Sequence, residues 1–260
     1  MKAVVLLSGG LDSTTALYVA RRDGKTPVCL TVHYGQLHER EISSAKKISS
    51  ALKLEHWIVP ISLPWGGSAL LADSKDLFDR DDPTGRSYNQ VPNIPIPKGR
   101  REDEIAKEIP VTYVPARNSI FLSLAASLAE VKEADSIYFG ANALDYSGYP
   151  DCRPEFIEAF EKMITLGTKV GVGSPRPELK SIGRGNRVHT SHSAIKIVAP
   201  LLKLSKAQIV KLAHGLGVPF EWTWSCYEGK ENPCGECDSC ILREKGFREA
   251  GIEDPLLKHA

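Results

Sequence analysis

Short apolar runs alternate with amphipathic segments along most of the chain. The apolar runs have the length of buried strands, and the amphipathic segments repeat apolar residues every three or four positions, as one face of a helix does. The pattern predicts strands at residues 2–8, 28–34, 56–61, 136–141 and 194–201, and helices at residues 14–24, 39–54, 117–134, 154–167 and 205–217. Parallel neighbouring strands need crossover connections, so this alternation predicts an α/β fold, a doubly wound parallel sheet with helices on both faces.

Two stretches break the alternation. Residues 64–110 and 171–194 hold many prolines, glycines and charges and few apolar residues. Loops of this length in a compact domain are usually functional lids or locally disordered insertions. Helix ends elsewhere are well marked, since Pro154 falls in the first turn of its predicted helix and Ser205 is the expected N-cap of another.

The composition is that of an ordinary globular protein with a core of its own. Of the 260 residues, 42% are hydrophobic and 25% are charged, a balance typical of folded domains. The net charge of +1 argues against an extended nucleic-acid surface. No apolar run reaches the roughly 18 residues of a membrane span, and residues 1–10 are too short an apolar start for a signal peptide. We therefore expect a cytoplasmic protein with no membrane or nucleic-acid partner.

The first predicted strand leads into a glycine-containing loop, "SGGLDST", at residues 8–14. Open parallel sheets place their ligands at this edge, and the two glycines let the backbone approach an anion. A helix start, here with Ser13 and Thr14, attracts phosphate. The loop lacks both the G-x-G-x-x-G pattern and the lysine of a Walker loop, whereas Asp12 suits a phosphate that brings Mg²⁺ with it. The simpler alternative is a tight turn whose helix is capped by Asp12 or Ser13.

Four of the six cysteines crowd the C-terminal end with a C-x7-C-x2-C-x2-C spacing: Cys226, Cys234, Cys237 and Cys240. In a reducing cytosol such a cluster favours metal ligation over disulfides. Four thiolates complete a tetrahedral Zn²⁺ shell and leave no open position for a catalytic water, so we expect structural zinc. An iron–sulfur cluster and redox sulfur chemistry through the Cys-x-x-Cys pairs are the alternatives. Cys152 is a candidate nucleophile, but a lone cysteine in a polar stretch is more often incidental.

The segment "SGGLDS" resembles the signature of the PP-loop ATP pyrophosphatase superfamily, which has an adenine nucleotide α-hydrolase-like, Rossmann-like fold and cleaves ATP between its α- and β-phosphates. Six further segments resemble the family of 7-cyano-7-deazaguanine synthases and occur in that family's order: "VHYGQLHERE", "YVPARNSIFLSLAAS", "FGANALDYSGYPDCRPEFIEAFEKM", "APLLKLSKAQIVKLA", "TWSCY" and "PCGECDSC". Ala116 is a departure, since that family usually has glycine there. We expect a nucleotide-binding α/β domain over residues 1–218 and a small zinc-binding segment over residues 219–260.

The resemblance implies an ATP-dependent ligase that forms C–N bonds and serves queuosine or archaeosine biosynthesis. The carboxylate of 7-carboxy-7-deazaguanine would be adenylated and attacked by ammonia to give an amide, and a second adenylation would permit elimination to the nitrile. The implied cofactors are ATP, Mg²⁺ and Zn²⁺, the partners are small molecules, and we expect a homodimer. Another PP-loop ligase, a tRNA-thiolating enzyme and a non-catalytic zinc-ribbon binding module are the rival interpretations.

The resemblance also implies roles for individual residues. The ATP-binding residues are those of the loop: Ser8, Gly9, Gly10, Leu11, Asp12, Ser13 and Thr14. The catalytic candidates are Asp12, nearest to Mg²⁺, and Arg117, which would neutralise phosphate or the substrate carboxylate or would otherwise be a solvated charge at a helix start. Residues 33–36 would meet the nucleoside. The substrate-binding candidates are Asp145, Tyr149, Asp151 and Arg153, and the alternative for both aspartates is a helix cap or a surface position.

Overall fold

The computed structural model describes residues 1–36, 39–63, 67–71, 94–105, 109–142, 149–173 and 194–256. Five strands form one sheet in the order β3-β2-β1-β4-β5, and every neighbouring pair is parallel. The strands are β1 (Lys2–Leu6), β2 (Thr26–His33), β3 (Glu55–Pro60), β4 (Ser136–Tyr138) and β5 (Lys196–Val198). The predicted α/β fold with a parallel sheet is confirmed.

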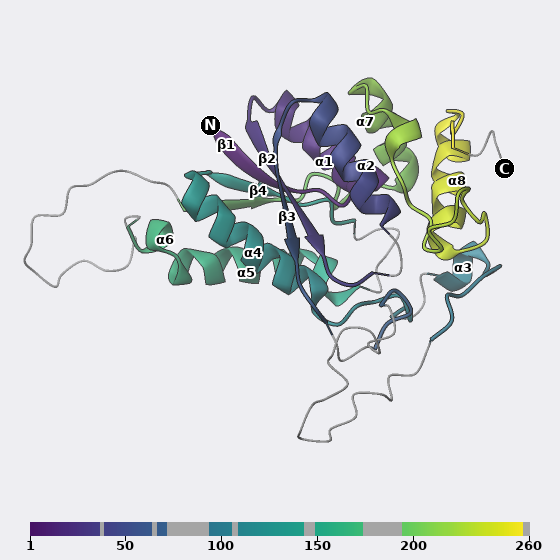
Figure 1. Cartoon of the computed structure of the whole chain (residues 1–260), viewed down its shortest axis with the longest axis horizontal. Helices are drawn as coiled ribbons and strands as arrows, with labels where there is room; N and C mark the ends of the chain where they lie inside the picture. Colours follow the sequence, from purple (N-terminus) through teal and green to yellow (C-terminus); the bar gives the residue numbers. More distant parts are fainter. Residues whose placement is uncertain are drawn as a thin grey trace, which may run out of the picture.

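Helices cover both faces of the sheet (Figure 1). They are α1 (Leu11–Arg22), α2 (Arg40–Ala51), α3 (Glu102–Ile105), α4 (Arg117–Lys132), α5 (Pro154–Gly167), α6 (Lys169–Gly173), α7 (Lys206–Gly215) and α8 (Asp238–Ala250). Alternate residues of β1 point to opposite faces. Val4 and Leu6 belong to the core under α4 and α5, whereas Ala3 and Val5 belong to the core under α1 and α2. Because both faces of β1 are buried, its sequence is continuously apolar.

The element ends differ from the prediction in several places. Helix α1 begins at Leu11 rather than at residue 14, and β4 and β5 each have three residues rather than the longer runs that were expected. Helices α3, α6 and α8 were not predicted. The expected N-cap at Ser205 is confirmed, because Ser205 Oγ accepts a hydrogen bond from Gln208 N at 3.3 Å and Gln208 Oε1 accepts one from Ser205 N at 2.8 Å.

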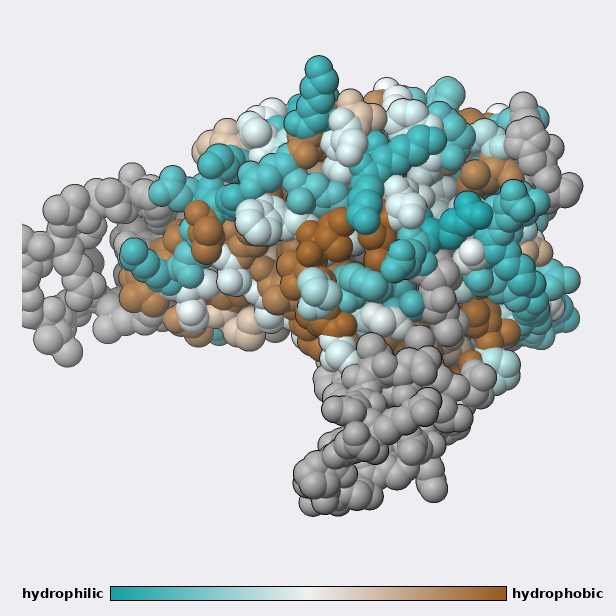
Figure 2. Space-filling model, viewed as in Figure 1, coloured by the Kyte–Doolittle hydropathy of each residue, from teal (hydrophilic) through white to brown (hydrophobic). Residues whose placement is uncertain are grey.

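The C-terminal helix α8 packs against α7 beside the end of the sheet (Figure 1). Within the described ranges, no helix is both long enough and apolar enough to cross a membrane. The space-filling view shows an apolar area over the lower end of β3 and the neighbouring α4, set among hydrophilic residues (Figure 2). Trp57 of the edge strand β3 is 46% exposed.

Candidate active site

A cavity of ≈ 270 Å³ lies where the carboxyl ends of β1, β2 and β4 meet. Its wall includes the loop after β1, Tyr34 after β2, Arg117 at the start of α4 and Lys206 at the start of α7. Trp224, in the segment before α8, closes another side. The cavity therefore lies at the sheet edge where open α/β folds bind ligands.

The loop after β1 meets this cavity with most of its predicted ATP-binding residues. Five of them line the wall: Ser8, Gly10, Leu11, Asp12 and Ser13. Gly9 and Thr14 do not, and Thr14 is fully buried, with no hydrogen-bond partner for its Oγ1 among the described residues.

The helix α1 that follows the loop has no side-chain cap. Gly10 is its N-cap. The Ser13 Oγ donates to Gly10 O at 3.1 Å and accepts from Ser8 N at 3.1 Å, which holds the loop closed on itself. The alternative that Asp12 or Ser13 caps the helix is therefore wrong. Since no side chain caps α1, the backbone N–H groups of its first turn are directed toward the cavity.

Asp12 is paired with a lysine that sequence reasoning missed. Lys206 Nζ lies 2.9 Å from Asp12 Oδ1 and 2.8 Å from Oδ2, and the Lys206 side chain is only 9% exposed. Gly246 of α8 makes room for it, since a Cβ at that position would lie 2.3 Å from Lys206 Cγ. The signal that would have found Lys206 is its place directly after the N-cap Ser205, at the start of a helix that follows the last strand.

Arg117 begins α4, as predicted, but it is not a solvated charge. It is partly buried in the cavity wall, its Nη1 donates to Tyr34 Oη at 3.1 Å, and its guanidinium lies 5.6 Å from the centre of the Tyr34 ring. Burial alone would lower the pKa of Arg117, but Tyr34, Tyr149 and Glu41 together hold it above its usual value. The preceding Ala116 has a φ of 53°, in the left-handed region that favours glycine.

Glu41, in the first turn of α2, also lines the cavity and was not singled out from the sequence. Burial raises the pKa of its carboxyl group to about 7, although Arg117 opposes the rise. Of the residues expected to meet the nucleoside, Tyr34 and Gln36 line the cavity and His33 does not. The segment "VHYGQLHERE" thus contributes to the cavity within the expected range, through Tyr34 and Gln36, and also beyond it, through Glu41.

The four candidates for substrate binding differ in their positions. Asp145 lies outside the described residues. Tyr149 lines the cavity, and its hydroxyl lies 2.9 Å from Thr112 Oγ1. Asp151 is buried, and its Oδ2 accepts a hydrogen bond from Asn118 N, in the first turn of α4, at 3.0 Å. Arg153 is the exposed N-cap of α5 and does not line the cavity. The contact of Asp151 matches the helix-cap alternative.

The lone Cys152 lies in the cavity wall but has the character of a structural thiol. Burial raises the pKa of the Cys152 thiol to about 12. Asn118 Nδ2 donates to its sulfur at 3.3 Å. A thiol that stays protonated at neutral pH is a poor nucleophile, so the geometry agrees with an incidental cysteine.

The four C-terminal cysteines come together as predicted. The sulfur atoms of Cys226, Cys234, Cys237 and Cys240 all lie within 4.8 Å of one another. Backbone amides support them: Cys234 N donates to Cys226 Sγ at 3.4 Å and Cys237 N donates to Cys234 Sγ at 3.3 Å. Four converging sulfurs with backbone donors could together hold one metal ion.

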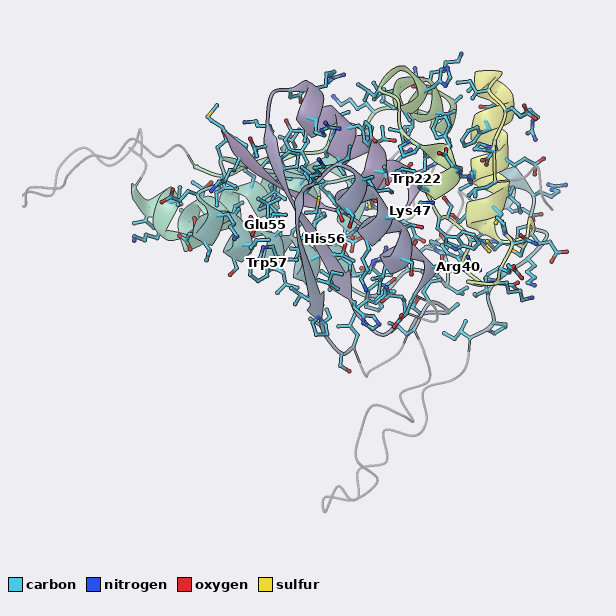
Figure 3. All side chains as sticks on the ribbon, turned by 45° about the horizontal axis from the view of Figure 1, so that its top comes forward. Arg40, Lys47, Glu55, His56, Trp57 and Trp222 are labelled. Carbon is cyan, nitrogen blue, oxygen red and sulfur yellow. The ribbon has the colours of Figure 1, made fainter. Side chains whose placement is uncertain are left out.

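The cysteine cluster is connected to the loop after β1 through Trp224. Trp224 Nε1 donates to Cys226 O, and Trp224 N donates to Gly9 O, both at 2.9 Å. Helix α2 adds two cation–π contacts, since Arg40 lies 5.1 Å from the Trp224 ring centre and Lys47 lies 4.7 Å from that of Trp222 (Figure 3). The C-terminal segment therefore contacts the loop after β1 at Gly9 and helix α2 at Arg40 and Lys47.

A family model described as "Queuosine biosynthesis protein QueC" matches residues 2–251. The chain belongs to the QueC family. Its relatives in this family include proteins named 7-cyano-7-deazaguanine synthase. The one from Trichodesmium erythraeum (strain IMS101) is 47% identical over 99% of this chain and 100% of its own length. The one from Anaeromyxobacter sp. (strain Fw109-5) is 49% identical over 98% of this chain and 95% of its own length.

The QueC match covers the loop, the cavity and the cysteine cluster together. Among solved structures, a 4-thiouridine synthetase in complex with RNA and ATP is 19% identical, with a TM-score of 0.41 over 96% of this chain and 50% of that chain. Similarity at this sequence identity and TM-score does not indicate a shared function.

Proposed function

We propose that the chain catalyses the reaction of 7-cyano-7-deazaguanine synthases, in which 7-carboxy-7-deazaguanine, ammonia and two ATP give 7-cyano-7-deazaguanine. The observation that supports this most directly is the cavity, where the loop of residues 8–13 meets Lys206 and Arg117. The names of the QueC relatives agree with it. A tRNA-thiolating enzyme is not favoured, because all four clustered cysteines converge on one point and leave no thiol of the cluster free for sulfur transfer.

The proposed reaction must solve a leaving-group problem. A carboxylate does not release oxide, so its oxygen first attacks the α-phosphorus of ATP and pyrophosphate departs. AMP is then the leaving group when ammonia attacks the carbonyl carbon. The amide oxygen reacts with a second ATP in the same way, and loss of AMP with the remaining N–H protons gives the nitrile. One cavity serves both rounds, because each activates an oxygen on the same carbon.

The residues of the chain supply positive charge around this phosphate chemistry. The loop amides at the start of α1 would hold the triphosphate. Lys206 and Arg117 would neutralise charge on the departing pyrophosphate and on the reacting carboxylate. Asp12 is a suitable oxygen ligand for Mg²⁺, which when bound would shield the phosphate charges. Tyr149, on the same wall, would contact the deazaguanine.

The cysteine cluster would hold Zn²⁺ in a structural role. Its four sulfurs leave no position for a catalytic water, and its contacts run through Trp224 to Gly9. We further propose that the chain acts in the cytoplasm as a homodimer with free ammonia as nitrogen donor, without a nucleic-acid partner. Light scattering would test the dimer, for which the expected mass is twice that of one chain.

Mass spectrometry of 7-carboxy-7-deazaguanine incubated with the protein, ATP, Mg²⁺ and ammonium tests the proposed reaction. We expect the nitrile from the wild type and a loss of about 100-fold or more in Lys206→Met, as for removal of one group that stabilises transition-state charge. Lys211→Met is the matched control, because Lys211 is an exposed lysine of the same helix. A wild type that forms no nitrile would refute the proposal, and equal rates in the two variants would remove Lys206 from it.

A further inference from the structure

Glu41 is a carboxylate on the cavity wall with no assigned task. It lies in the first turn of α2, whose backbone approaches the loop after β1 so closely that a Cβ on Gly9 would lie 2.2 Å from Glu41 O. Within the described residues, no hydrogen bond or ion pair engages the Glu41 carboxylate, although Arg117 and Tyr34 are near enough to act on it electrostatically. The side chain is thus available to a bound molecule.

The other titratable groups of the cavity are unsuited to accept a proton at neutral pH. Beside Glu41 they are Asp12, Tyr34, Arg117, Tyr149, Cys152 and Lys206, with Tyr227 and Arg243 nearer the C-terminal segment. Burial raises the pKa of Tyr34 and of Tyr149, and these two tyrosines hold the pKa of Arg117 above its usual value, so all three keep their protons at neutral pH. Burial raises the pKa of Cys152 to about 12, and the Asp12 carboxylate is already paired with Lys206.

Glu41, unlike the other titratable groups of the cavity, is suited to accept a proton at neutral pH. Burial raises the pKa of its carboxyl group to about 7, and the positive Arg117 keeps the rise from going further. A carboxylate with this pKa can take a proton near neutral pH and release it again within a catalytic cycle. A general base works best when its pKa lies near the operating pH.

We propose that Glu41 is the proton acceptor for the reacting nitrogen in both halves of the reaction. This inference rests on the proposed function. In the first half, the C–N bond forms between ammonia and the adenylated carbonyl carbon, the C–O bond to AMP breaks with its electron pair leaving on AMP, and a nitrogen proton passes to Glu41.

In the second half, Glu41 takes one nitrogen proton as the amide oxygen bonds to the α-phosphorus and pyrophosphate leaves. It takes the last nitrogen proton as the C–O bond to AMP breaks and the nitrile forms. Each half consumes one ATP and releases AMP and pyrophosphate, and Glu41 gives its proton to solvent between the steps. No oxidant or reductant is needed.

The test separates activation of the carboxylate from chemistry at nitrogen. ATP–pyrophosphate exchange with 7-carboxy-7-deazaguanine and no ammonium reports the first adenylation alone, and mass spectrometry with ammonium reports the nitrile. For Glu41→Gln we expect exchange within about threefold of the wild type and nitrile formation lowered by about 100-fold or more. Glu41→Asp, which keeps a carboxylate, should recover part of the loss. Glu39→Gln, an exposed neighbour before α2, is the matched control and should behave as the wild type.

Wild-type protein provides a second test that needs no variant. At a fixed concentration of free ammonia, nitrile formation should rise with pH through about 7, as Glu41 ionises, while exchange should not. Identical pH dependence of the two activities would overturn the assignment, and so would nitrile formation by Glu41→Gln within about threefold of the wild type. A fall of exchange and nitrile formation by the same factor would also overturn it. A wild type with neither activity would instead refute the proposed function itself.

Discussion

The contact between the loop after β1 and helix α2 depends on the absence of a side chain at Gly9. This residue has a φ of +90°, and a Cβ built on it would lie 2.2 Å from Glu41 O and 2.7 Å from Ala45 N. Both are backbone atoms of α2, so no side-chain rotation can relieve the clash. Gly9→Ala must therefore displace either the loop or the helix.

The size of the effect follows from two separate costs. Left-handed backbone costs an L-residue roughly 1–2 kcal/mol, and forcing extra atoms into a packed site costs typically about 1–3 kcal/mol. Together they predict that Gly9→Ala lowers the free energy of unfolding by roughly 2–5 kcal/mol. Gly24→Ala is the matched control, because Gly24 has a φ of +74° but nothing within 4 Å of its added Cβ. It should show the backbone cost alone, about 1–2 kcal/mol.

Urea unfolding of both variants and the wild type, at one zinc concentration, measures these differences. The difference between the two glycine variants isolates the contact with α2. If the two substitutions lower the free energy of unfolding equally, the close approach of loop and helix is not a packing constraint and the reasoning is wrong. Gly9→Ala should also weaken ATP-dependent nitrile formation more than Gly24→Ala does, because only Gly9 belongs to the loop whose residues line the cavity.

Three further predictions concern other sites. Ala116→Gly should raise the free energy of unfolding by up to about 1 kcal/mol in urea titrations, because the left-handed strain at Ala116 exceeds the entropic cost of glycine. Cys237→Ser removes one of the four proposed zinc ligands, so it should lose zinc by metal analysis and, through loss of the metal, lose helical circular dichroism from α8, which begins directly after Cys237; stable, zinc-loaded protein would contradict this. Burial raises the pKa of Asp135, but hydrogen bonds from Lys25 and Ser136 outweigh it and hold the pKa below its usual value. The stability from this interaction is present above the unfolded-state pKa of about 3.9 and lost as pH falls below it. In Asp135→Asn, the free energy of unfolding measured by urea titration should therefore fall less steeply with decreasing pH than in the wild type.

The buried strands could be predicted from the sequence because their apolar runs are continuous and short. Their ends could not, because apolar residues at the carboxyl end of a run have two possible roles. Phe139 and Ala141 follow β4, are buried and line the cavity, although Phe139 N still donates a hydrogen bond to Val198 O of β5 at 2.9 Å. An apolar pattern reports burial, and it does not distinguish a sheet partner from a cavity wall.

The loop was predicted from local residues, but its counter-charge was not. Asp12 and Lys206 are separated by 194 positions, and no local pattern links them. Asp151 shows the converse limit. A carboxylate beside the cavity and a carboxylate that caps a helix look alike in the sequence, and only the hydrogen bond to Asn118 N distinguishes them. Residue types at a sheet edge therefore predict where chemistry occurs more reliably than they predict which side chain performs it.

Helix α8 shows how a local interpretation of a segment can hide its connection to a distant site. Its residues were assigned to a zinc-binding segment, and Gly246 in its middle disfavours a helix by propensity. The structure requires that glycine, because any side chain there would collide with Lys206. The cysteine cluster positions the start of α8, α8 leaves room for Lys206, and Lys206 pairs with Asp12. This chain of contacts crosses the predicted division between residues 1–218 and 219–260. A metal held by the four cysteines would thereby help to fix the positions of Lys206 and Asp12, which we propose to act on the phosphates of ATP.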